Sequence, residues 1–251
     1  MLILESNWGE MAFYASGAQS IPVVLLHGTG CDSMDWGPVV RCLSGETRVV
    51  TMDFRGHGES SMPADHFTLE DLAQDVLMLG IKLGLEKMLL VGHSLGGMVA
   101  LDAARLSKDV AGLVLLEGWT SLSVSVTAFD GFGRDRLYGS LDRESIERIK
   151  RKYDTIRRRF REPVWDRFQQ SVGEFDGAQF LLGAQIPILE VYGAMGRNDR
   201  TQGNLGVPEN PLIEWVWIEG AGHYLPHERP LEVAQAVRSA MEKLNPSNGA
   251  K

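Results

Sequence analysis

The chain has 251 residues, of which 44% are hydrophobic and 23% charged, a balance that is ordinary for one globular domain or one domain with an insertion. A net charge of −8 and a pI near 5.3 argue against a nucleic-acid-binding protein. The two cysteines, Cys31 and Cys42, form no disulfide framework and favour a reducing, cytoplasmic setting. The first residues lack the pattern of a signal peptide, and no apolar run approaches the ~20 residues that span a membrane.

Short apolar runs alternate along the chain with stretches of helical periodicity. An antiparallel pair of strands is predicted at residues 2–6 and 11–15. Runs rich in valine, leucine and isoleucine predict buried strands at residues 23–26, 48–52, 87–91, 110–116, 186–192 and 213–218. Helices are predicted at residues 69–83, 98–106 and 231–244. This alternation predicts an α/β fold with a mostly parallel central sheet of about eight strands and helices on both faces.

One segment interrupts the alternation. Residues 118–185 hold no strand-like run but carry a charged helical stretch at 143–161 and a second helix that ends near residue 172. We therefore predict a core made of residues 1–117 and 186–251, with residues 118–185 as a helical cap. Because the cap follows the carboxyl end of a strand, it is expected to lie over a site there.

A G-x-S-x-G motif, Gly92 to Gly96 with Ser94 at its centre, lies between a predicted strand and a predicted helix. In that context the motif indicates a nucleophile elbow, in which the serine hydroxyl is exposed at the top of a sheet. The backbone N–H of Leu95 begins the following helix and can stabilise an oxyanion.

A serine hydroxyl needs a base to act as a nucleophile at neutral pH. His223 is the best candidate, because it follows the last predicted strand in Gly220-Ala221-Gly222-His223 and comes late in the chain.

Four segments together resemble those of the α/β-hydrolase family: His27-Gly28-Thr29-Gly30, Asp53-Phe54-Arg55-Gly56-His57-Gly58-Glu59-Ser60, Gly92-His93-Ser94-Leu95-Gly96 and Gly220-Ala221-Gly222-His223. The resemblance covers roughly residues 20–244. It implies a Ser-His-acid triad and an oxyanion hole formed by the N–H groups of Thr29 and Leu95. It implies no metal and no organic cofactor. Within it, His27, Arg55 and His57 are expected to brace loops rather than react.

The triad acid has two candidates. Family members commonly carry it three residues after a glycine, but here Gly196 occupies that place, counted from Gly193. Asp199 lies three residues further on. The alternative, Glu117, ends an apolar strand, where an unpaired carboxylate is costly and requires a partner such as an imidazolium. We favour Glu117 slightly and retain Asp199.

The predicted function is hydrolysis of a carboxylic ester, or of a lactone, thioester or amide, with a small-molecule substrate. Trp36, Trp119 and His93 are candidate pocket residues, and His93 also fits a packing or supporting role. The alternatives are a carbon–carbon bond hydrolase, a cofactor-free oxygenase or perhydrolase, and a ligand receptor that retains the triad. The chain is expected to be a monomer or homodimer that binds neither membrane nor nucleic acid. Basic residues in the cap suggest a weaker further possibility, attraction of an anionic substrate.

Overall fold

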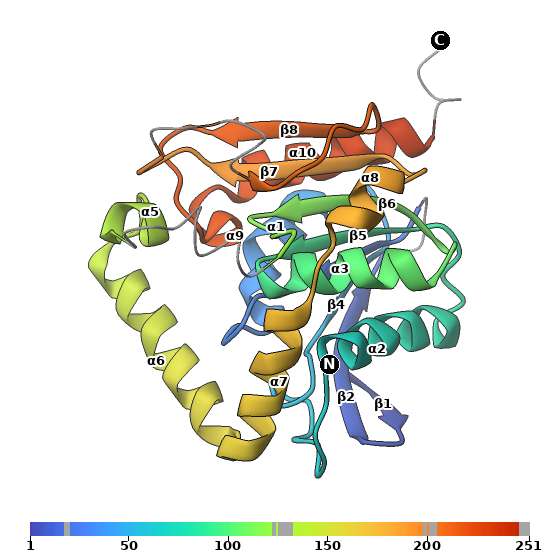
Figure 1. The fold of residues 1–251 in the computed structure, drawn as a ribbon, viewed down its shortest axis with the longest axis vertical. Coiled ribbons are helices and arrows are strands. Elements are labelled where there is room, and N and C mark those ends of the chain that lie inside the picture. The colour runs from blue at the N-terminus through green and yellow to red at the C-terminus, as the bar shows by residue number, and fades with distance from the viewer. Residues whose placement is uncertain (18–20, 122–123, 125–132, 198–199, 201–204, 246–251) are drawn as a thin grey trace.

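The computed structural model describes residues 1–17, 21–121, 124, 133–197, 200 and 205–245. Eight strands form one sheet in the order β1-β2-β4-β3-β5-β6-β7-β8, which confirms the predicted α/β fold (Figure 1). The strands β1 and β2 pair antiparallel to each other, β2 pairs antiparallel to β4, and the remaining neighbours are parallel. Their bounds are β1 (Leu2–Ser6), β2 (Gly9–Ser16), β3 (Val23–Leu26), β4 (Val49–Met52), β5 (Met88–His93), β6 (Val110–Leu116), β7 (Ile188–Gly193) and β8 (Ile213–Ile218).

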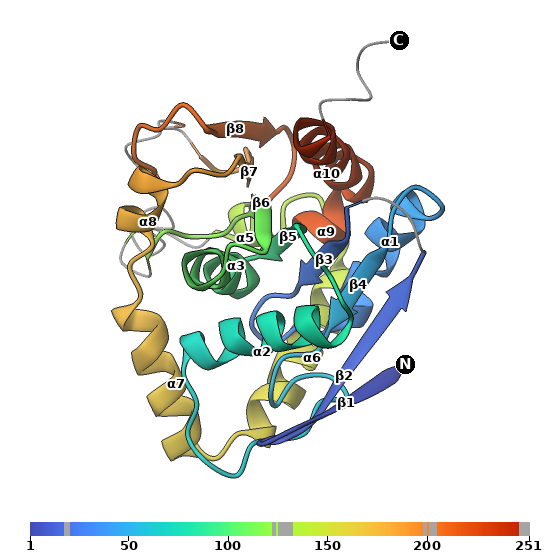
Figure 2. The ribbon, with the colours of Figure 1, turned by 90° about the vertical axis from the view of Figure 1, so that its right-hand side faces the viewer.

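Helices cover both faces of this sheet (Figure 2). On one face lie α2 (Leu69–Lys82) and α3 (Leu95–Leu106), and on the other lie α1 (Gly37–Leu43) and α10 (Pro230–Leu244). The side chain of Thr68 caps α2 by accepting a hydrogen bond from the amide of Asp71. In the described part of the chain, no helix combines the length and the apolar character needed to cross a bilayer.

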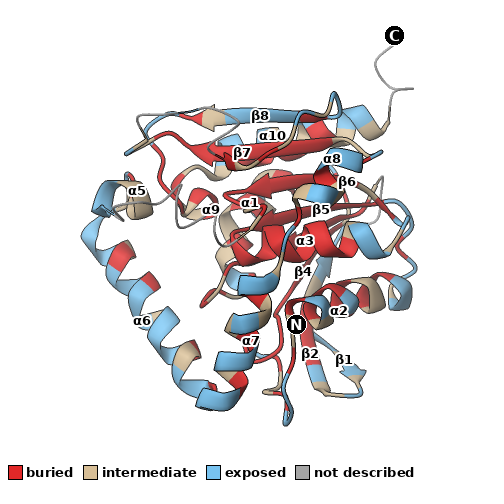
Figure 3. Cartoon of the chain, in the orientation of Figure 1, coloured by how far each residue is buried: buried red, intermediate tan, exposed pale blue. Residues whose placement is uncertain are grey.

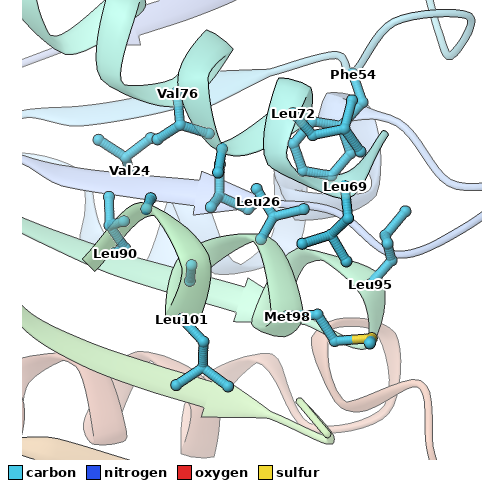
Figure 4. Close-up of a cluster of buried hydrophobic side chains, with 14 of the residues drawn as sticks. Val24, Leu26, Phe54, Leu69, Leu72, Val76, Leu90, Leu95, Met98 and Leu101 are labelled. Carbon is cyan, nitrogen blue, oxygen red and sulfur yellow. The ribbon is translucent and has the colours of Figure 1, made fainter. Parts of the chain in front are cut away.

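Two apolar clusters fill the space between the sheet and the helices. Because side chains alternate along a strand, Val24 and Leu26 of β3 pack toward α2 and α3, as Figure 4 shows. Val23 and Leu25 of the same strand pack toward α1 and α10. Both faces of the central strands are thus buried, which is why these strands read as continuous apolar runs.

The segment between β6 and β7 is helical, with α5 (Arg134–Tyr138), α6 (Arg143–Arg159), α7 (Glu162–Glu174) and α8 (Ala178–Gly183). We call residues 118–185 the cap. Its two ends meet, since Ser121 forms a β-bridge with Asp176 and the amide of Gly177 donates to the carbonyl of Thr120 at 2.7 Å. The long helix α6 is largely exposed and buries only isolated residues (Figure 3).

The connection from β5 to α3 is so tight that side chains are excluded from its flanks. A Cβ atom at Gly92 would lie 2.2 Å from the carbonyl oxygen of Gly96, and one at Gly96 would lie 2.1 Å from the carbonyl oxygen of Leu26. Both distances are far below van der Waals contact, and the groups approached are backbone. Glycine at these positions therefore lets α3 pack directly on β3 and β5.

One strand residue is a buried acid. Glu190 of β7 is fully buried, accepts a hydrogen bond from the hydroxyl of Tyr192 at 2.8 Å, and has a second oxygen with no partner. Burial, and secondarily the charge of Glu117, raise the pKa of Glu190 to about 8, against the opposing effect of the Tyr192 hydroxyl. At neutral pH this side chain is therefore largely a neutral acid.

The first prediction concerns the tight connection. Gly96→Ala should lower the free energy of unfolding by about 3 kcal/mol or more, because the added methyl group overlaps the backbone of β3. The matched control is Gly183→Ala in α8, where nothing lies within 4 Å of the added atom, so stability should be unchanged or rise by up to ~1 kcal/mol. Urea unfolding measures both. Equal stabilities of the two variants would contradict the steric argument.

The second prediction concerns Glu190. As the pH rises from about 4.5 to about 8, the unfolded chain releases this proton while the folded protein retains it, so the wild type loses stability over that window. Glu190→Gln removes the effect, and its stability relative to wild type should rise by roughly 2–5 kcal/mol between pH 5 and pH 9. Denaturant unfolding at both pH values tests this.

The control is Glu214→Gln on the neighbouring strand, an exposed carboxylate paired with Lys243. Its stability difference from wild type should not grow over the same pH interval. A pH-independent difference for Glu190→Gln would show that Glu190 is ionised in the folded protein.

Candidate active site

Ser94 occupies the turn between β5 and α3 with a backbone conformation that is rare for a residue with a side chain. Its φ is 54° and its ψ is −117°. The turn is fixed by hydrogen bonds on both sides, from the Ser94 amide to the carbonyl of Leu116 at 3.0 Å and from the Gly97 amide to the Ser94 carbonyl at 2.9 Å. Such strain persists only where the surroundings enforce it, and it is common at functional sites. Ser94 therefore has the geometry of a nucleophile elbow.

The loop after β3 abuts Ser94. A Cβ atom at Gly28 would lie 3.2 Å from the Cβ of Ser94 and 3.0 Å from Nδ1 of His93, so this loop approaches as closely as a glycine permits. The next residue, Thr29, is half-buried beside it. On the other side of Ser94, the amide of Leu95 begins α3 and has no acceptor within the helix. The backbone of the Thr29 loop and the first amide of α3 thus both lie next to the serine.

His27 holds this loop rather than reacting. Its Nδ1 donates to the carbonyl of Gly28 at 2.8 Å, and its Nε2 accepts from the amide of Phe54 at 3.0 Å. Burial lowers the pKa of His27, which favours the neutral ring that this pair of hydrogen bonds requires.

The loop after β4 is also held by polar side chains. Asp53 accepts hydrogen bonds from the amides of Ser33 at 2.6 Å and Glu59 at 2.9 Å. Arg55 forms a buried ion pair with Asp75, with 2.6 Å between Nε and Oδ2. Asp53 and Arg55 therefore hold the loop after β4 in its conformation.

His223 lies against His93, the residue before Ser94, although the two histidines are 130 positions apart in the chain. Its ring lies 4.9 Å, centroid to centroid, from the ring of His93, the residue before Ser94, and 5.4 Å from the stacked indole of Trp119. Nε2 of His93 donates to the carbonyl of His223 at 2.9 Å. The pKa of His93 is well below its usual value because the ring is buried, so this side chain acts as a neutral support of the His223 loop.

Glu117, one residue beyond β6, is fully buried and has a φ of 50°. Its Oε2 lies 3.5 Å from Nδ1 of His223 and 2.5 Å from Nη2 of Arg197, and its Oε1 accepts from the amide of Gly193 at 2.7 Å. The carboxylate is therefore compensated by a guanidinium, an amide and an imidazole. The other candidate acid, Asp199, lies outside the described residues.

Arg197 is the site residue that sequence reasoning missed. Its side chain is 5% exposed, and its guanidinium also lies over the rings of Tyr192 at 5.3 Å and Trp217 at 5.5 Å. The only signal in the sequence was the argument that a buried Glu117 needs a partner. Nothing in the spacing pointed to a residue eighty positions away.

The pocket residues predicted from the sequence separate into two groups. Trp119 and His93 both lie against the ring of His223. Trp36 is 1% exposed and packs with Val39 and Leu43 in the cluster between the sheet and α1 and α10. The contacts of Trp36 are those of a core residue.

The basic residues of the cap dock it onto the core. Lys152 of α6 lies 2.8 Å from Oδ2 of Asp35, in the segment that follows the Thr29 loop. Arg159 donates to the backbone carbonyls of Gly58 at 2.6 Å and Ser60 at 3.0 Å. Lys152 and Arg159 therefore bind the cap to loops of the core.

Curated proteins of known name are similar in sequence to parts of this chain. It is 39% identical over 105 residues to the dihydrolipoyllysine-residue acetyltransferase component of the acetoin cleaving system of Pseudomonas putida, a match covering 41% of this chain and 28% of that protein. It is 34% identical over 139 residues to 3-oxoadipate enol-lactonase 1 of Acinetobacter baylyi, covering 51% of this chain and 52% of that one. The chain thus matches about half or less of the length of these curated relatives.

A similar solved structure is a thermophilic esterase from Thermogutta terrifontis, with a TM-score of 0.76, 29% identity and 94% coverage of both chains. The family model described as "Alpha/beta hydrolase family" matches residues 23–236, which include the Thr29 loop, Ser94, Glu117 and His223. The chain therefore belongs to the α/β-hydrolase family.

Proposed function

We infer that this protein hydrolyses a carboxylic ester or lactone through an acyl-enzyme on Ser94; thioesters and amides fit the same chemistry. The observation that carries the proposal is the strained turn at Ser94, directly after His93, whose ring lies 4.9 Å from that of His223 and whose Nε2 binds the His223 carbonyl. A serine in such a turn, with a second histidine held nearby through its neighbour, is the arrangement expected of a nucleophile and its base.

In the proposed mechanism His223 accepts the proton of Ser94 as the serine oxygen attacks the substrate carbonyl. The N–H groups of Thr29 and Leu95 bind the resulting oxyanion, each contributing roughly 3 kcal/mol of barrier lowering. His223 then protonates the leaving alcohol, and an acyl group remains on Ser94. A water molecule, deprotonated by His223, hydrolyses this ester and restores the free enzyme.

Glu117 is proposed as the triad acid, with Asp199 as the alternative. The 3.5 Å separation from Nδ1 of His223 supports this role, because a carboxylate there fixes the ring and stabilises the imidazolium formed during attack. The close ion pair with Arg197 holds the Glu117 side chain in place.

An ester or lactone hydrolase is preferred here to a carbon–carbon bond hydrolase. A carbon–carbon bond hydrolase acting on an anionic diketone would be supported by an arginine that faces Ser94 from the cap. Three cap arginines bind other groups: Arg157 pairs with Glu162, and Arg159 and Arg161 donate to backbone carbonyls of core loops. The named lactonase and esterase relatives act on substrates of the class proposed here.

The third prediction concerns Ser94→Ala. The variant should lose the activity of the wild type on nitrophenyl esters by about 10⁴-fold or more, because the acyl-enzyme cannot form. Comparing the activities on esters with acyl chains of increasing length also shows which chain length the substrate pocket accepts best. If the wild type is no faster than the variant on every ester and on simple lactones, esterase chemistry is wrong. Covalent labelling without turnover would instead support the receptor alternative, and peracid formation a perhydrolase.

The fourth prediction compares the two candidate acids. Glu117→Gln should reduce kcat by about 10³-fold or more, since the amide no longer stabilises the imidazolium, whereas Asp199→Asn should change kcat by less than about tenfold. Steady-state kinetics on the best ester of the panel decides between them. A large loss in Asp199→Asn together with a mild loss in Glu117→Gln would reverse the assignment.

A further inference from the structure

The one-turn helix α9 (Leu225–Glu228), directly after the His223 loop, contains a buried carboxylate that the proposed chemistry does not use. Glu228 is 8% exposed. It accepts three backbone hydrogen bonds, from Gly222 at 2.9 Å, Tyr224 at 3.1 Å and Ser140 at 3.0 Å. Two of these amides flank His223, and the third lies in the cap between α5 and α6. One carboxylate thus binds both the loop of the candidate base and the cap.

The cap and the His223 loop are also pressed together sterically. Gly139 has a φ of 47°, and a Cβ atom there would lie 1.9 Å from Oε2 of Glu228 and 2.3 Å from the amide of Gly222. The amide of His223 itself donates to the carbonyl of Leu137 in α5 at 3.2 Å. There is no space for a water molecule or a side chain between the two segments at this point.

Arg229, the residue after Glu228, also connects the cap to the His223 loop. Arg229 donates to Oγ of Ser140 at 2.9 Å and to the carbonyl of Gly220 at 2.9 Å. Burial raises the pKa of Glu228 although the amides of Gly222, Ser140 and Tyr224 favour its charged form. An apolar residue here would leave the amides of Gly222, Tyr224 and Ser140 without this acceptor, so the position requires a side chain that binds all three.

We propose that Glu228 is a positioning residue that couples the cap to the candidate base: its carboxylate fixes the turn at Ser140 and the amides on both sides of His223 as one unit. The imidazole then has its working position only when the cap turn is docked. This inference rests on the proposed function for the role of His223, but the coupling itself is a property of the backbone and can be measured separately.

The fifth prediction concerns Glu228→Gln. The amide keeps an acceptor on one side only, and its NH₂ group faces a backbone donor on the other, so at least one of the three contacts is lost. Hydrogen–deuterium exchange of the full-length protein should be about tenfold faster both in residues 137–140 and in residues 220–224. The matched control is Glu242→Gln, an exposed carboxylate near the end of α10, which should alter neither segment. Faster exchange in only one of the two segments overturns the coupling.

Kinetics supply the second readout. With active sites counted by the nitrophenol burst, kcat per titrated site in Glu228→Gln should fall by about 10- to 100-fold while KM changes by less than about threefold. A merely structural role would reduce the number of titrated sites and leave kcat per site unchanged, which contradicts the proposal. If the wild type turns over no ester faster than Ser94→Ala, the esterase function is wrong, and the exchange experiment still decides the coupling.

Discussion

The tight passage from β5 into α3 is the constraint on which the rest of the site depends. Gly92 and Gly96 allow the helix backbone to touch the strands, and Ser94 between them is forced to a φ of 54°. That conformation directs the serine away from the core and leaves the first amide of α3 unbonded within the helix. The proposed nucleophile and one proposed oxyanion donor therefore come from a single packing requirement, enforced by the buried sheet around the turn.

Around this turn, supports come from three separate parts of the chain. His27 shapes the Thr29 loop, His93 holds the carbonyl of His223, and Arg197 with the amide of Gly193 holds Glu117. Several of these groups are buried and polar, and each has a partner that satisfies it. The site is preorganised in this sense, because its polar groups are oriented before any substrate arrives.

The sheet and its mostly parallel order were predictable from the sequence, because buried strands and glycine-bounded turns leave local signals. Helices α1 and α9 were not predicted, since each is short, begins with a proline in its first turn and carries little periodicity. The pairing of Arg197 with Glu117 and the bonds from Glu228 to Ser140 join residues 80 and 88 positions apart, so only the folded chain reveals them. Trp36 was predicted as a pocket residue because it is aromatic, and in the structure it packs in the apolar core.

The most direct test of the account is to trap the acyl-enzyme. Mixing the protein with a nitrophenyl ester, quenching with acid within the burst and mapping the added mass by peptide mass spectrometry should find one acyl group, located on Ser94. An acyl group on any other residue, or steady turnover with no adduct while Ser94→Ala remains fully active, would contradict the account.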